Sequence, residues 1–210
     1  MTMTMWMRMT LIGAGALTVL AISTGCSSSN EPEHPASHSA PPSATAAPGM
    51  TAAAEAHNDA DVTFAQHMIP HHTQAIEMSD TLLAKQGIDP RVTELANQIK
   101  AAQGPEIQQM QGWLTQWGTA PMPPMSGHGD MPGMSGIMSE QDMTALKNAQ
   151  GVDAAKLFLT QMISHHEGAI TMAQTEIKDG QYPSAVELAH AIVTDQQREI
   201  DTMNGILATL

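Results

Sequence analysis

Hydrophobic side chains recur at every third or fourth position between residues 59 and 210, which is the spacing of one face of an α-helix. At ~100° per residue, Phe64, His71 and Met78 fall within an arc of about 40° on the first predicted helix. The segment from Phe158 to Met172 repeats the same order of residue types. Each of two predicted helices therefore carries histidines on its apolar face.

A second helix is predicted in each repeat, because Glu94-Leu-Ala-x-x-Ile99 matches Glu187-Leu-Ala-x-x-Ile192. A glycine followed by a proline predicts a turn between the two helices of each repeat. These pairs are Gly87 with Pro90 and Gly180 with Pro183. Pro70 lies inside the first predicted helix, where it removes a hydrogen bond and is expected to kink the chain. Two hairpins of like design predict an all-α fold, a four-helix bundle with a pseudo-twofold axis.

The N-terminal residues have the pattern of an export signal, in which a basic residue precedes an apolar run over residues 11–22. The run is too short to span a bilayer as a permanent helix. Thr24-Gly25-Cys26 resembles the end of a bacterial lipoprotein signal, although Ser23 stands where an aliphatic residue is usual. We therefore expect an exported protein whose mature chain begins at a lipid-modified Cys26, anchored on the outer face of the membrane in the bacterial cell envelope.

Two low-complexity segments separate the predicted parts of the chain. Residues 26–58 are rich in Ser, Pro, Ala and Thr and cannot bury enough apolar surface to fold, so we expect a disordered tether. Residues 118–140 are rich in Gly, Pro and Met and predict a loop, which either links the two repeats or captures metal itself. The expected organisation is a signal peptide over 1–25, the tether, and a duplicated bundle over 59–210 with units of about 59–117 and 150–210.

Composition narrows the range of partners. The chain has 8 Lys and Arg against 21 Asp and Glu, so it would repel phosphate backbones, and nucleic acid is not expected as a partner. Cys26 is the sole cysteine, so no internal disulfide can form. The chain also has 18 Met, whose thioether can bind a metal without first losing a proton.

The paired histidines and the methionines around them are the donors that a soft metal ion prefers. Thioether and imidazole are neutral ligands that favour Cu(I), whereas Mg²⁺ and Ca²⁺ prefer oxygen and Zn²⁺ is less well matched without a thiolate. Ag(I) is equally soft and is expected to bind at the same place. Because Met does not titrate, binding is expected to survive mild acid until His protonates near its reference pKa of about 6.5.

The candidate ligands come from both repeats: His67, Met68, His71, His72, Met78, Met110, Met162, His165, His166, Met172 and Met203. Glu106 and Glu199 lie on the inward arc of the second helices and are expected to accept hydrogen bonds from the histidines, behind the metal. Two ordinary explanations stay open, namely that the methionines fill the core and that the two glutamates are solvated bundle edges. Four buried histidines would still need four partners, which a small core does not easily supply.

The doubled motif Phe-x-x-x-Met-Ile-x-His-His-x-x-Ala-Ile-x-Met closely resembles the bacterial family known as domain of unknown function 305, over roughly Asp61 to Leu210. The resemblance implies an exported, ferritin-like four-helix bundle associated with copper binding and resistance, with His and Met ligands and no established catalytic activity. The positions that match are Met68, His71, His72, Met78, Met162, His165, His166 and Met172. His67 has no counterpart, because Gln161 stands in its place in the second repeat.

The expected function is sequestration, resistance or delivery of copper at the cell envelope, without catalysis, and with a copper transporter or oxidase as a further partner. One alternative is a ferritin-like di-iron redox enzyme, because Glu187-x-x-His190 has the spacing that such sites use. The equivalent in the first repeat is Glu94-x-x-Asn97, so the di-iron ligand set is broken. A second alternative is a metal-free structural bundle at the cell surface, which failure to bind any metal would support.

Overall fold

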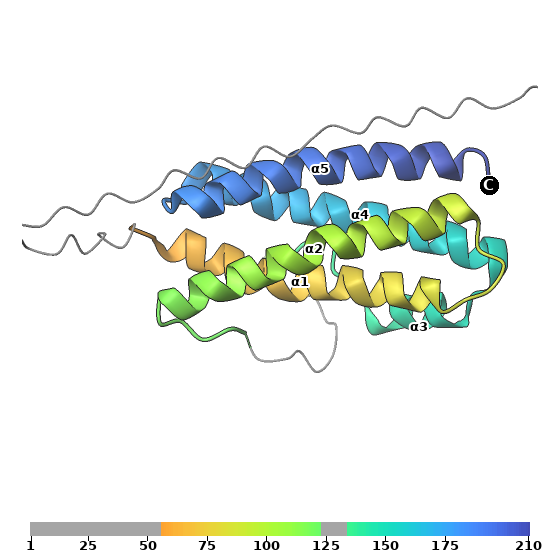
Figure 1. The fold of residues 1–210 in the computed structure, drawn as a ribbon, viewed down its shortest axis with the longest axis horizontal. Coiled ribbons are helices and arrows are strands. Elements are labelled where there is room, and N and C mark those ends of the chain that lie inside the picture. The colour runs from red at the N-terminus through yellow and green to blue at the C-terminus, as the bar shows by residue number, and fades with distance from the viewer. Residues whose placement is uncertain (1–55, 123–133) are drawn as a thin grey trace, which may run out of the picture. The chain divides into compact units, whose positions relative to one another are not determined.

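The computed structural model describes residues 56–122 and 134–210, which fold into helices joined by turns and irregular segments (Figure 1). The helices are α1 (Asp59–Leu83), α2 (Pro90–Gln116), α3 (Glu140–Asn148), α4 (Gly151–Asp179) and α5 (Pro183–Leu207). The all-α prediction is confirmed, and α3 is a short additional helix that the repeat pattern did not predict. The predicted signal peptide, Cys26, nearly all of the tether and residues 123–133 of the Met-rich loop lie outside the described residues.

Polar caps fix where the helices begin. The side chain of Asn58 accepts hydrogen bonds from the first turn of α1, and Asp61 bonds back to the Asn58 backbone in a capping box. Ser139 begins α3 in the same way. The α2 helix starts at Pro90 behind the Asp89 cap, because proline has no N–H to leave unpaired in a first turn. The α1 helix continues as one element through Pro70.

The two predicted turns are built differently. Gly87 takes a φ of 73°, a left-handed conformation that favours glycine. Gly180 is the C-cap of α4 with a φ of −71°, so it opens the predicted turn without the left-handed conformation of Gly87. Glycine is needed there for space, because a β-carbon at Gly180 would collide with the carboxyl group of Glu176.

The long helices pack as two hairpins, α1 with α2 and α4 with α5, and the hairpins meet mainly through α1 and α4. This is the arrangement of a four-helix bundle built from two repeats. In Figure 1, α3 lies beside the C-terminal half of α1, and it also contacts α4. The α3 helix therefore covers one end of the α1/α4 contact, and none of the other described helices covers the opposite end in the same way.

Two groups of buried side chains form the core. The leucine-side cluster contains, among others, Met78, Leu82, Leu95, Leu146, Leu159, Met162 and Met203. The tryptophan-side cluster contains, among others, Phe64, Met68, Met110, Trp113, Met172 and Tyr182. On both α1 and α4 the paired histidines stand in the sequence between a methionine of one cluster and a methionine of the other, so the histidine layer separates the two clusters.

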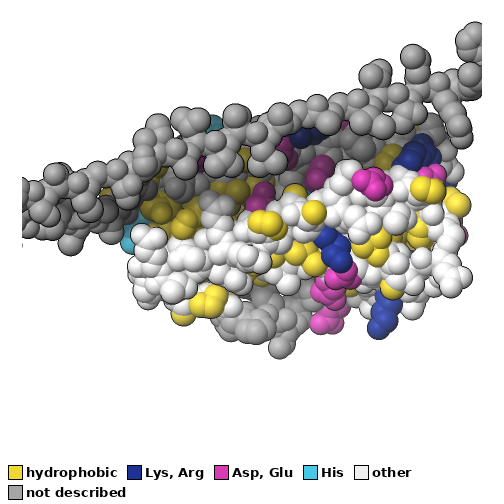
Figure 2. All heavy atoms as spheres, viewed as in Figure 1, with side chains coloured by type: hydrophobic (Ala, Val, Ile, Leu, Met, Phe, Trp, Pro, Cys, Tyr) yellow, Lys and Arg dark blue, Asp and Glu magenta, His cyan; other side chains and the backbone are white. Residues whose placement is uncertain are grey.

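The outer surface of the bundle is mostly polar. Hydrophobic side chains occur in small separate groups among polar and charged ones on the face shown in Figure 2. Of the helices in the described part of the chain, none is long and apolar enough to cross a membrane.

A buried pair of acids joins the start of α1 to the turn before α5. Asp61 accepts hydrogen bonds from the backbone N–H groups of Gln181 and Tyr182 at 3.0 and 2.8 Å. Burial opposes ionisation of Asp61, but hydrogen bonds from Glu176 and the backbone outweigh it and lower the pKa of Asp61. Burial, followed by the interaction with Asp61, raises the pKa of Glu176 to about 8, so Glu176 is protonated at neutral pH.

We predict that Glu176→Gln removes a pH dependence of stability. Because the pKa of Glu176 is higher in the fold than in the unfolded chain, its contribution to stability is complete below about pH 4.5 and is lost as the pH rises to about 8. The wild-type free energy of unfolding should therefore fall relative to that of the variant between pH 5 and 8, by at most ~1.4 kcal/mol per pH unit. Urea unfolding of the metal-free protein across this range measures the difference.

The exposed Glu187 provides the matched control, since Glu187→Gln should leave the wild-type pH profile unchanged. Parallel profiles for wild type and Glu176→Gln would show that Glu176 is ionised in the fold at neutral pH.

Candidate metal centre

Two adjacent histidines on each of α1 and α4 point into the bundle. His71, His72, His165 and His166 are all fully buried. The rings of His71 and His165 face each other across the contact between α1 and α4, with centroids 3.7 Å apart and planes tilted by 42°. Because neighbouring residues on a helix are separated by ~100°, His72 and His166 face the second helix of their own hairpin instead.

The outer histidines are each held by a carboxylate. Nε2 of His72 donates to Oε2 of Glu106 on α2, and Nε2 of His166 donates to Oε2 of Glu199 on α5, both at 2.6 Å. The hydrogen bonds expected from the sequence are present, and the two carboxylates are only about one-fifth exposed. With the proton on Nε2, the lone pair lies on Nδ1, which is buried in both rings without a hydrogen-bond partner among the described residues.

The inner histidines are less well satisfied. Nε2 of His71 donates to the carbonyl oxygen of Ser135 at 3.0 Å, and Nδ1 of His71 has no partner in the described part of the chain. Both ring nitrogens of His165 lack a partner there. A buried polar group left unpaired costs about 1–3 kcal/mol, so these nitrogens point to a ligand that satisfies them.

Burial keeps the inner imidazoles uncharged. It is the main cause that lowers the pKa of His71 to about 3, and the neighbouring His72 adds to the effect. Burial is likewise the main cause that holds the pKa of His165 well below its ordinary value, and the charge of His71 is the next largest cause. The expectation that these histidines protonate near pH 6.5 is therefore wrong for the inner pair, because a charged ring is disfavoured in an apolar core.

A short connecting segment, residues 134–139, closes the outer side of the inner pair, and we call it the strap. It supplies the Ser135 carbonyl to His71, and the backbone of Met138 exchanges two hydrogen bonds with the buried amide of Gln74 at 2.7 and 2.9 Å. On α4 the position that corresponds to Gln74 is Gly168, and a β-carbon there would collide with the backbone of Ser135. One repeat therefore binds the strap, and the other makes room for it.

The predicted methionine ligands divide into two sets of three. Met78, Met162 and Met203 lie in the leucine-side cluster. Met68, Met110 and Met172 lie in the tryptophan-side cluster. All are fully buried except Met172, which is 9% exposed. The strap adds the buried Met138 to the first cluster and Met134 to the second.

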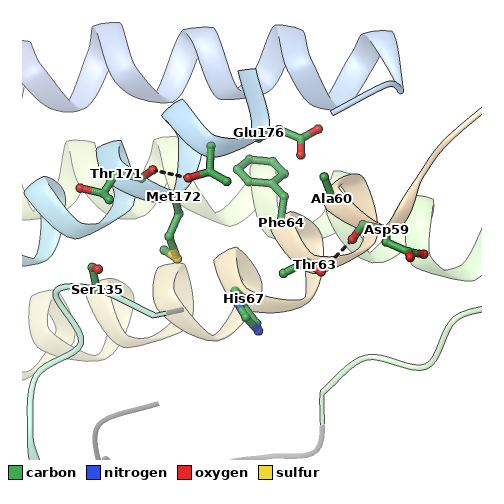
Figure 3. A pocket seen from close by; sticks show the side chains of 10 residues that line it. Asp59, Ala60, Thr63, Phe64, His67, Ser135, Thr171, Met172 and Glu176 are labelled. Atoms are coloured by element: carbon green, nitrogen blue, oxygen red, sulfur yellow. Dashed lines mark hydrogen bonds between the residues drawn. The ribbon is translucent and has the colours of Figure 1, made fainter. Parts of the chain in front are cut away.

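His67 is placed apart from the four buried histidines. It is partly exposed and lines a cleft between α1 and α4 together with Met172 (Figure 3). The structure thus brings His71 and His165 together and places His72 and His166 behind them, but it does not bring His67 into the buried layer.

Sequence reasoning missed several residues around the centre. Gln103 and Gln196 are buried one turn before Glu106 and Glu199, and amide atoms of both lack partners among the described residues. Their repetition in both halves was a signal that the sequence offered. The role of Ser135 carried no such signal, because it acts through its backbone carbonyl.

The described residues contain no group of three or more His, Cys, Asp or Glu arranged to hold a metal ion. A centre in this layer would therefore combine imidazole with thioether donors. The Glu187/His190 pair of the di-iron alternative is exposed on α5 and does not contribute to the buried layer.

Comparison with known proteins shows the family. Residues 61–207 match the family described as Domain of unknown function (DUF305). The chain belongs to the DUF305 family. No protein with a curated description matches it in sequence.

Solved structures of other DUF305 proteins are similar over most of their length. A DUF305 fragment from Deinococcus radiodurans is 34% identical with a TM-score of 0.65, covering 73% of this chain and 98% of that one. A DUF305 protein from Streptomyces coelicolor, named as a candidate secreted protein, is 31% identical with a TM-score of 0.65, covering 71% and 91%.

CopM in its Cu(II)-bound form is 32% identical with a TM-score of 0.62, covering 71% of this chain and 96% of CopM. Structures of CopM with Cu(I) and with Ag bound are also similar to this chain.

We predict that Gly168→Ala destabilises the fold by about 1–3 kcal/mol, because the new methyl group would push the strap away from α4. The displacement should also break the hydrogen bond between His71 and Ser135. Chemical denaturation of the metal-free variant measures the loss.

Gly112→Ala is the matched control, because Gly112 lies inside α2 with open space around it. That change should instead stabilise the fold by up to ~1 kcal/mol, the ordinary gain in helix propensity. Equal stabilisation by both changes would show that the strap does not press on α4.

Proposed function

We propose that this DUF305 protein binds Cu(I), with Ag(I) as a mimic, in the layer of buried histidines and the methionines that flank it. It sequesters the ion or hands it on at the cell envelope, and its role is binding rather than catalysis. The observation that carries the proposal is that four fully buried imidazoles each hold a ring nitrogen that no described residue satisfies.

The chemistry of the donors supports a soft monovalent ion. The inner imidazoles are uncharged over the physiological pH range, and the flanking thioethers are uncharged at any pH. Such donors suit Cu(I) better than hard divalent ions, which prefer oxygen. The carboxylates of Glu106 and Glu199 orient the outer rings and place a negative charge near the layer, which favours an added cation.

The relatives support the same metal. CopM, which is about 30% identical to this chain, has been solved with Cu(I), with Cu(II) and with Ag bound. Because this chain has a similar fold and a layer of paired histidines, we propose that it also binds a soft metal ion.

We predict that His71→Ala combined with His165→Ala weakens Cu(I) binding by roughly 100-fold or more, which is about 2.8 kcal/mol of binding free energy. The inner pair supplies three of the five ring nitrogens that lack partners among the described residues, so its loss removes most of the candidate nitrogen ligands. An anaerobic competition titration with Cu(I), Cu(II), Zn(II) and Fe(II) measures both affinity and preference.

His190→Ala removes an exposed histidine on α5 and serves as the control, with wild-type affinity expected. Far-UV circular dichroism checks that the double variant stays helical. Undiminished Cu(I) affinity in a helical double variant would refute the site. A preference for Fe(II) would favour the di-iron alternative, and failure to bind any metal would favour the structural bundle.

Export and lipid anchoring complete the proposal. The N-terminal pattern that ends at Cys26 supports both, and the Streptomyces coelicolor relative is named as a candidate secreted protein. A tether of about 30 residues would let the bundle reach copper or a partner such as a copper transporter away from the membrane surface.

We predict that Cys26→Ser releases the protein from the membrane fraction, because serine cannot carry the thioether-linked lipid. Fractionation of bacterial cells that express the full chain, followed by immunoblotting, measures the distribution. Ser27→Ala, at the neighbouring position, should leave the protein in the membrane fraction. Equal fractionation of wild type and Cys26→Ser would contradict lipid anchoring.

A further inference from the structure

We propose that the cleft beside His67 is the route by which a soft cation reaches the buried histidines, and that His67 and Met172 form its first binding position. This inference rests on the proposed function, because a route needs a buried destination. It adds a second, outer metal position and a direction of loading.

The cleft opens at the surface and reaches Ser135 of the strap, beside the histidine layer. It has a volume of about 440 Å³ and lies between α1 and α4, lined by residues that include Phe64, His67, Ser135, Met172 and Glu176. Ser135 is the link, because it lines the cleft while its carbonyl accepts the hydrogen bond from His71. His67 precedes His71 by one helical turn, so the two rings are displaced by about 6 Å along α1.

The donors along this route become progressively less exposed. His67 is partly exposed, Met172 is 9% exposed, and His71 and His165 are fully buried. Figure 3 shows the thioether of Met172 reaching from α4 into the space beside α1, with His67 at the edge of the same cleft. An ion could therefore exchange water for imidazole, then for thioether, before it enters the core.

The donor types at the cleft select the same class of ion as the core. Imidazole and thioether are neutral and soft, so they favour Cu(I) and Ag(I) over Zn²⁺ or Mg²⁺. Among the described residues, His67 makes no hydrogen bond that would have to break before it binds a cation. Asp59 lies at the same cleft, and its negative charge would favour the approach of a cation.

The pseudo-twofold axis supplies the comparison, because the equivalent position in the other half lacks the histidine. Gln161 and Met78 replace His67 and Met172 there, and Met78 is fully buried. The amide of Gln161 donates to the carbonyl of Asp142 on α3 at 3.0 Å. Leu146 of α3 is fully buried in the leucine-side cluster. Two clefts lie beside α3 in this half, both lined by Glu77 and Thr81, but neither is lined by a histidine. Loading is therefore directed to the His67 side.

The test is the rate at which purified full-length protein takes up Ag(I), followed by stopped-flow quenching of tryptophan fluorescence. Trp113 lies in the same cluster as the fully buried Met68 and Met110, so it reports arrival of the ion in the core. His67→Gln places the residue of the second repeat in the first, and uptake should slow by about tenfold or more. Thr171→Phe narrows the cleft without removing a donor, and should slow uptake while equilibrium dialysis finds the wild-type amount of bound Ag(I).

Glu77→Phe is the matched control, since Glu77 occupies the position of Thr171 in the other half, where the clefts that it lines have no histidine. Its uptake rate should equal that of wild type. Wild-type rates in both His67→Gln and Thr171→Phe would overturn the route while leaving metal binding itself intact. Loss of the tightly bound ion in His67→Gln would make His67 a ligand of the buried layer and would also overturn the route. Absence of Ag(I) from wild-type protein at equilibrium would overturn the proposed function as well.

Discussion

Burial of four imidazoles in the core is the constraint on which the rest of this structure depends. Because these rings are fully buried, their nitrogens need hydrogen-bond partners or ligands within the protein, and the surrounding elements supply some of these partners. Glu106 and Glu199 take the outer rings, and the Ser135 carbonyl takes one nitrogen of His71. The rings of His71 and His165 face each other, and the remaining nitrogens have no partner among the described residues. A soft cation would stabilise this arrangement, which the protein alone leaves incomplete.

The two repeats are close copies, and the few positions at which they differ make the two ends of the α1/α4 contact different from each other. Gln74 binds the strap, whereas the equivalent Gly168 lets the strap approach α4. His67 lines a cleft, whereas the equivalent Gln161 holds α3 in place. A perfectly symmetric bundle would expose both ends of the α1/α4 contact or neither. Because the two repeats are joined by one segment, its helix α3 can cover only one end of the α1/α4 contact.

The sequence predicted the helices, the duplicated hairpins and the burial of the histidine pairs. These features depend on a local period of 3.6 residues, which the motif shows in both repeats. It also predicted that Glu106 and Glu199 would bond to the histidines. It could not predict the hydrogen bond to Ser135 or the closeness of His71 and His165, because both depend on how distant segments pack. The low pKa of His71 was missed for the same reason, since its main cause is burial by the complete bundle.

Anomalous X-ray diffraction from crystals of the Ag(I)-loaded protein tests the central claim most directly, because it locates the ion without assuming its ligands. The account predicts a silver peak within the buried layer, bonded to at least one nitrogen of His71 or His165 and to a methionine sulfur. Silver confined to exposed side chains such as His190, with the buried imidazoles unchanged, would contradict it.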